Sequence, residues 1–309
     1  MGSSISLRYS KVCTSLIGGG SRESLYRSRM ATLLALLSSV LWGSADYHAG
    51  NLSKKYPTIA VLGINQGFGL LFGAILVAIS GSWHATALGL HGYLIYGAIA
   101  GLSGYIGLIC LYAGLATGRM GVVSPISSLS VLIPLAYALI YKGDHLTPIL
   151  TLGVIAATCG GILASGPEFS ERLSLRPVLY ALGAALGFGI ALAFMAKGSE
   201  ESALMTMTSM RATTFFVTAA IALRLRTLGG IPVNRLPLLA TIGIADFSAN
   251  LLLGVATTKG LVSLAMVLGA LYPIATALLA YKFLHERLHK IQYIGVALAI
   301  TGVAIISAS

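Results

Sequence analysis

The sequence contains the stretch GVVSPISSLSVLIP at residues 121–134 and a similar stretch, GLVSLAMVLGALYP, at residues 260–273. In each stretch a serine follows the opening glycine by three residues, and a proline follows that serine by ten. The correspondence extends to both sides, because the first-copy residues Trp42, Asp144, Gly153 and Gly160 are matched by Phe188, Glu286, Gly295 and Gly302. Internal similarity over this distance indicates that the chain consists of two copies of one structural unit.

Apolar segments as long as a bilayer-spanning helix occur throughout both copies. Of the 309 residues, 56% are hydrophobic and only 9% are charged, and the mean hydropathy is +0.88. A helix needs roughly 20 apolar residues to cross about 30 Å of hydrocarbon. The sequence therefore predicts an all-α integral membrane protein with ten transmembrane helices, at residues 31–51, 58–80, 92–115, 120–141, 147–165, 177–196, 203–223, 236–256, 261–284 and 290–307.

Each copy comprises five of these helices, so residues 31–165 form the first unit and residues 177–307 the second. Because five crossings leave the chain on the opposite side of the membrane, the second unit must be inverted relative to the first. We therefore expect two inverted five-helix repeats. Residues 1–29 are rich in Ser and Arg and lack an apolar h-region. We interpret them as a disordered tail or an upstream-start artefact, with Met30 as the true first residue.

Several short motifs follow one another in a fixed order along the chain. They are Leu41-Trp42-Gly43-Ser44, Leu111-Tyr112-Ala113-Gly114-Leu115, Pro134 and Pro273, and His285-Glu286-Arg287-Leu288. In their order and duplication the chain resembles the EamA-type members of the drug/metabolite transporter superfamily. The resemblance implies secondary transport of a metabolite, an amino acid or a drug-like solute, typically its export, by a multi-pass protein of the plasma (inner) membrane. The family often has an arginine in the second helix, where this chain has Gln66, whereas Arg211 stands at the similar place in the second copy.

Three ionisable side chains fall well inside the predicted spans: Asp46, Arg211 and Asp246. A charge at the bilayer centre costs about 2.5–3.5 kcal/mol on insertion scales, so such residues are functional candidates by default. Asp46 lies one helical turn from Trp42, and Asp246 lies one turn from Asn250. We expect these polar faces to converge on a water-accessible cavity, because lipid cannot solvate them.

The remaining site candidates are uncharged. Gln66 and Tyr112 complete the predicted substrate-binding or ion-binding set, and Pro134 and Pro273 are candidates for helix bends because proline removes a backbone hydrogen bond. Two interpretations of Asp246 remain open. In one, Asp46 or Asp246 exchanges a proton in step with substrate binding. In the other, an aspartate and Arg211 form a buried ion pair that only holds helices together.

Other classes of function rest on single features. His285-Glu286-x-x-His289 matches the HExxH spacing of zinc hydrolases, but the segment is a polar helix junction and no third ligand is recognisable. A membrane zinc hydrolase stays an alternative, as does a receptor or scaffold without transport. Our main interpretation has no catalytic residue, no metal and no cofactor. The net charge of +11 lies mostly ahead of the first span and between spans, which favours lipid headgroups over nucleic acid as its partner.

Charge also bears on orientation and partners. Outside residues 1–29, the loops after odd-numbered spans carry about eleven Lys and Arg and those after even-numbered spans about three. The positive-inside rule then places the termini outside, whereas the resemblance implies cytoplasmic termini, so orientation stays open. Expected partners are a small-molecule substrate and the lipid bilayer, with protons and a second copy of the chain as further candidates.

Overall fold

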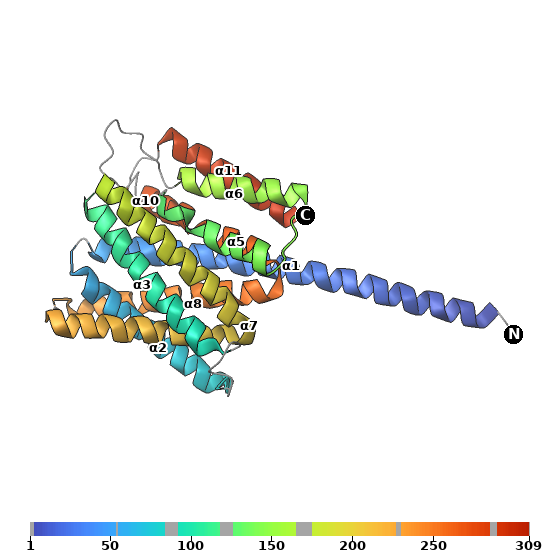
Figure 1. The fold of residues 1–309 in the computed structure, drawn as a ribbon, viewed down its shortest axis with the longest axis horizontal. Coiled ribbons are helices and arrows are strands. Elements are labelled where there is room, and N and C mark those ends of the chain that lie inside the picture. Colours follow the sequence, from blue (N-terminus) through green and yellow to red (C-terminus); the bar gives the residue numbers. More distant parts are fainter. Residues whose placement is uncertain are drawn as a thin grey trace.

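The computed structural model describes residues 3–53, 55–83, 92–117, 126–164, 175–226, 230–284 and 289–308, and every regular element within them is helical (Figure 1). The prediction of an all-α protein is confirmed. The elements are α1 (Ser3–Ser53), α2 (Thr58–Ser80), α3 (Tyr93–Thr117), the 3-10 helix η1 (Leu129–Val131), α5 (Leu132–Tyr141), α6 (Pro148–Ala164), α7 (Leu175–Leu225), the 3-10 helix η2 (Val233–Arg235), α8 (Leu236–Lys259), α9 (Val262–Gly269), α10 (Tyr272–Leu284) and α11 (Lys290–Ala308).

Most of these helices have the length and composition of membrane spans. Within the described ranges, six segments are long and apolar enough to cross a bilayer: Ile59–Ser80, Tyr93–Leu111, Leu175–Arg224, Val233–Lys259, Val262–Phe283 and Lys290–Ala308. Two apolar helices, Ile126–Tyr141 and Pro148–Ala164, are shorter. Large apolar side chains such as Leu71, Ile109 and Ile155 lie exposed on the outer faces, as lipid requires. The chain is therefore a multi-pass integral membrane protein.

The longest of these segments, α7, changes direction at Ser202. The backbone of Ser202 is extended, with φ −158° and ψ 110°. On one side of it Phe188 packs on Gly107 of α3, and on the other Met210 packs on Gly101. In a straight helix Phe188 and Met210 would be about 33 Å apart, whereas Gly101 and Gly107 are separated by about 9 Å. The two parts of α7 therefore run in opposite directions beside α3, and the turn falls between the predicted spans 177–196 and 203–223.

The two halves of the chain are interleaved in space. The most extensive helix contacts join the first half to the second: α3 packs on α7, α6 on α11, α1 on α8 and α10, and α2 on α7 and α8. Figure 1 shows α6 and α11 side by side at one edge of the bundle. Each half thus buries much of its surface against the other.

The contact between α6 and α11 depends on glycine. Gly153 lies against Gly302, and Gly160 lies against Gly295, so residue numbers rise along one helix as they fall along the other. The helices are antiparallel and nearly in backbone contact, as small residues allow. In the internal repeat Gly153 and Gly160 correspond to Gly295 and Gly302. Each of the two glycine pairs is thus the image of the other.

Two further predictions concern helix boundaries. Helix α1 begins at Ser3, and its N-terminal part extends beyond the bundle at the end where the C-terminus also lies (Figure 1). The interpretation of residues 1–29 stays a prediction. Helix α5 begins two residues before Pro134, and α10 begins one residue before Pro273, each after a 3-10 helix or a helix end. The helix-bend candidates therefore lie directly after irregular backbone.

Candidate functional site

A buried arginine joins the two halves of the chain. Arg211 lies in the second part of α7, and its Nη1 donates a hydrogen bond of 2.6 Å to Oε1 of Gln66 in α2. Its Nη2 lies 2.8 Å from Oδ2 of Asp246 in α8. The arginine side chain is 5% exposed and the aspartate side chain 24% exposed. The ion pair is therefore shielded on the arginine side and open to a water-sized molecule on the aspartate side.

Neighbouring polar side chains hold this pair in place. Oγ1 of Thr214 lies 3.1 Å from Oε1 of Gln66, within reach to donate a second hydrogen bond to it. Nδ2 of Asn250 donates to the backbone oxygen of Asp246 at 2.7 Å and approaches its Oδ1 at 3.3 Å. The contact between Nη2 of Arg211 and Oδ2 of Asp246 is not aligned as a hydrogen bond, so charge attraction holds this pair together.

Glycines bring the three helices close enough for one arginine to reach both partners. A Cβ at Gly243 would overlap the backbone oxygen of Asn65, so α2 and α8 touch through their backbones. A Cβ at Gly69 would lie 3.1 Å from the oxygen of Gly243 and 3.6 Å from Cδ of Arg211. The polar cluster of Gln66, Arg211 and Asp246 therefore sits at a helix crossing that larger residues would open.

Helices α1 and α10 add an acidic group and two aromatic rings. The rings of Trp42 and Tyr272 meet edge to face, with centroids 6.0 Å apart. Gly43, beside Trp42, accepts a 3.1 Å hydrogen bond from Oγ1 of Thr276, which fixes α1 against α10. Asp46 is exposed, yet its carboxylate interacts electrostatically with Asp246 and Tyr272. Asp46 therefore lies near α8 and α10.

The structure thus brings together Asp46, Trp42, Gln66, Arg211, Asp246 and Asn250 of the predicted set. Their roles remain predictions. Pro134 is buried in α5 and belongs to the packing of that helix. The side chains of Tyr112 and Pro273, and residues 285–288 of the HExxH motif, lie outside the described residues. Within the described ranges, no group of three His, Cys, Asp or Glu side chains is arranged to hold a metal ion.

Two polar contacts near the helix ends were not predicted. Oδ2 of Asp144 accepts hydrogen bonds from the backbone nitrogen and Oγ of Ser263, at 2.8 and 2.7 Å, at the start of α9. Glu200 bridges Lys142 and Lys197 at 2.8 and 3.0 Å. An acid present in both sequence copies and a serine opening a helix were available signals for the first contact. Nothing in the sequence pattern indicated the second.

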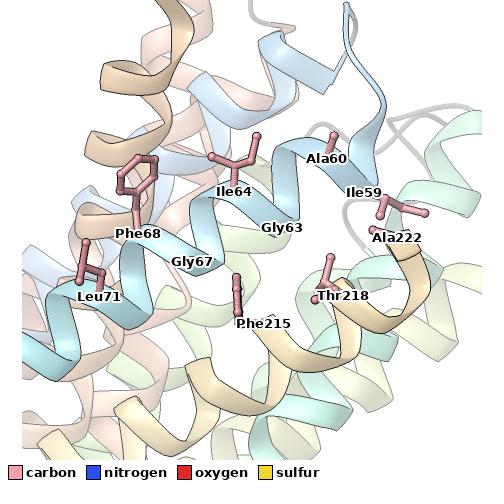
Figure 2. Close-up of a pocket in the computed structure, with 11 residues that line it drawn as sticks. Ile59, Ala60, Gly63, Ile64, Gly67, Phe68, Leu71, Phe215, Thr218 and Ala222 are labelled. Atoms are coloured by element: carbon pink, nitrogen blue, oxygen red, sulfur yellow. The ribbon is translucent and has the colours of Figure 1, made fainter. Parts of the chain in front are cut away.

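An apolar groove lies beside the polar cluster, between α2 and the second part of α7. Its volume is about 370 Å³, and Figure 2 shows α2 residues from Ile59 to Leu71 facing Phe215, Thr218 and Ala222 of α7. No charged side chain lines it. The groove therefore suits acyl chains, and the chemistry available to a polar solute lies with the buried cluster.

Comparison with known proteins agrees with this arrangement. The model of the EamA-like transporter family matches residues 29–166 and again residues 175–308. The chain belongs to the EamA-like transporter family. Its two EamA-like units are the two sequence copies, and the resemblance seen in the motifs is confirmed.

The EamA-like fold is also found among solved structures. One crystal structure superimposes with a TM-score of 0.72 at 17% sequence identity, covering 89% of this chain and 94% of the other. At that identity the likeness concerns the fold alone. A comparison with curated proteins gives no match.

Proposed function

We propose that this protein is a secondary transporter that exports a small polar metabolite, amino acid or drug-like solute across the plasma membrane. The observation that carries the proposal is the cluster of Gln66, Arg211 and Asp246, where helices of both EamA-like units meet. Charged side chains are expensive inside a bilayer and are found there mainly along solute or ion pathways. Membership of a transporter family supports the same conclusion.

The proposal includes ten crossings in two inverted repeats. The six long segments and two shorter helices make eight, the reversal at Ser202 divides one of them, and α1 adds the tenth. The reciprocal pairs Gly153–Gly302 and Gly160–Gly295 support inversion, because a two-fold axis in the membrane plane exchanges them. Two inverted units that exchange conformations would open the site first to one side of the membrane and then to the other.

Proton coupling is assigned to Asp246 in this proposal. Protonation would remove the charge of Asp246 and leave Arg211 held only by Gln66, so the contact between α7 and α8 has two states. A transporter needs such a two-state element for a ligand to bias. The competing interpretation is that the ion pair only ties the helices together.

Proteoliposomes with an imposed pH gradient separate these interpretations. A screen of amino acids, other metabolites and drug-like solutes first identifies a cargo that accumulates. With that cargo, Asp246→Asn should lose pH-driven accumulation and keep exchange of internal for external solute, because binding and alternation do not require the proton. The matched control is Glu201→Gln, which removes an exposed carboxylate away from the site. Gradient-driven accumulation that survives in Asp246→Asn would remove Asp246 as the coupling group.

A further inference from the structure

The charges of the described site do not balance. Arg211 is matched by Asp246 at 2.8 Å, and this leaves Asp46 as an additional negative charge. Asp46 makes no hydrogen bond or ion pair with any other residue in the described ranges, and the charge that acts on it is the carboxylate of Asp246. A carboxylate in a predicted membrane span is stabilised by a positive partner. Asp46 is therefore suited to pair with a cation from outside the protein.

The surroundings of Asp46 favour an organic cation over a metal ion. Trp42 lies one turn earlier on α1, and its ring meets that of Tyr272 at 6.0 Å. Aromatic faces attract ammonium groups and also cover the apolar body that carries them. A small metal ion would instead need several oxygen ligands around Asp46. In the described part of the chain, no group of three His, Cys, Asp or Glu side chains is arranged to hold a metal ion.

Arg211 provides no spare positive charge for Asp46. Its Nη2 lies 2.8 Å from Oδ2 of Asp246, and its Nη1 donates to Oε1 of Gln66. A carboxylate on the ligand would restore the net negative charge that an amine at Asp46 removes, so the ligand should carry no acidic group.

We propose that the site binds a monocationic amine with an apolar body, with Asp46 as its counter-charge and Trp42 and Tyr272 against its body. The inference rests on the proposed function, of which it names the substrate class. It places amino alcohols, amino amides and amino esters ahead of zwitterionic amino acids. The preference follows from the net charge of minus one that Asp46, Asp246 and Arg211 leave.

The two tryptophans of the chain make a direct binding test possible. Trp83 is 81% exposed and lies at the end of α2, so Trp83→Phe leaves Trp42 as the only tryptophan and as a reporter within the site. In nonionic detergent its fluorescence is titrated with four compounds of one skeleton: phenylalaninol, phenylalanine, 3-phenylpropanol and 3-phenylpropionate. Phenylalaninol should give a saturable change at a concentration at least tenfold lower than the other three.

Substitution of Asp46 distinguishes binding to its carboxylate from partitioning of the compounds into the detergent. Asp46→Asn in the Trp83→Phe background should weaken phenylalaninol binding about tenfold or more, because the ammonium group then loses its counter-charge. Asp46→Glu should retain part of the affinity, and Glu201→Gln should retain all of it. Equal titrations for the four compounds, tighter binding of phenylalanine, or unchanged affinity in Asp46→Asn would each overturn the proposal.

The binding test does not depend on transport. Saturable binding of phenylalaninol with no accumulation of any solute would count against the proposed transport and leave the cation site intact. Accumulation of anionic or neutral solutes that is insensitive to Asp46→Asn would support the proposed transport and count against the cation site.

Discussion

Gln66 of the first copy stands at a place similar to that of Arg211 in the second copy. Its amide oxygen accepts from Arg211 at 2.6 Å and lies 3.1 Å from Oγ1 of Thr214, so it supplies an acceptor that an arginine could not. An arginine in place of Gln66 would bring a second positive charge beside Arg211. The uncharged residue in α2 and the charged residue in α7 are therefore complementary.

The strength of the buried pair can be measured at the residue scale. Arg211→Met leaves Asp246 buried without its partner and should lower the free energy of unfolding by about 3–5 kcal/mol. The double variant Arg211→Met/Asp246→Leu should recover much of that loss, because neither charge remains. Unfolding by denaturant in detergent of these two variants and of Asp246→Leu, each compared with the parent protein, closes a double-mutant cycle. Losses that simply add would show that Arg211 and Asp246 do not interact.

The ionisable residues at the site were identifiable from sequence because lipid makes any charge conspicuous. Asp46, Arg211 and Asp246 could be named by type and position. What the sequence could not supply is the pairing. Arg211 takes Gln66, 145 positions away, as its hydrogen-bond partner, and no local periodicity links the two. The isolation of Asp46 from any cation likewise becomes visible only when the helices are packed.

At the scale of elements, glycine decides which helices touch. A Cβ at Gly43 would lie 2.5 Å from Cβ of Ala275 and 2.6 Å from the backbone oxygen of Tyr272, and backbone cannot yield as a flexible side chain can. A Cβ at Gly50, two turns later on the same helix, would meet nothing within 4 Å. The two glycines of α1 thus form a natural comparison.

We expect Gly43→Ala to separate α1 from α10 and to lower the free energy of unfolding by about 1–3 kcal/mol, the usual effect of overpacking. Gly50→Ala should be neutral or stabilising by up to about 1 kcal/mol, since alanine favours the helix. Denaturant unfolding of both variants in detergent measures the difference. Equal effects at the two positions would mean that the α1–α10 contact is looser than the structure shows. Trp42 fluorescence in the Trp83→Phe background reports whether the site moves as well.

Element boundaries were predicted well where the chain itself breaks the helix. The polar stretch around Glu200 and Glu201 separated two spans, and the extended backbone at Ser202 lies there. The span predicted at 261–284 proved to be two helices, α9 and α10, because the chain leaves the helix between Gly269 and Tyr272. A hydropathy profile does not reveal this break, because apolar residues continue through it.

On the scale of the whole molecule, the two EamA-like units meet at the membrane face that carries the start of α9. Asp144 follows α5 in the first unit, and Ser263 lies in the first turn of α9 in the second. The carboxylate accepts from the serine backbone and hydroxyl, so it caps a helix of the opposite unit. Ser263 is fully buried, which shields this contact from water.

Asp144→Ala should therefore lower the free energy of unfolding by about 1–2 kcal/mol, the range for loss of a helix cap. Ser263→Ala should cost less, because its backbone nitrogen still donates to Asp144. Thermal unfolding in detergent measures both, and His145→Gln, an exposed neighbour, provides the control. If Asp144→Ala melts with the parent protein, the cap does not hold the two units together.

The interleaving of the halves has a consequence for how the protein is made. Helices α1 to α6 leave the ribosome before α7 to α11 exist, yet their most extensive contacts are with those later helices. Gln66 therefore enters the bilayer before its hydrogen-bond donor, Arg211, has been synthesised. The glycine face of α6 remains uncovered longer still, since α11, its main contact, is synthesised after the other described helices. Packing of the first half is therefore complete only once α11 has been inserted.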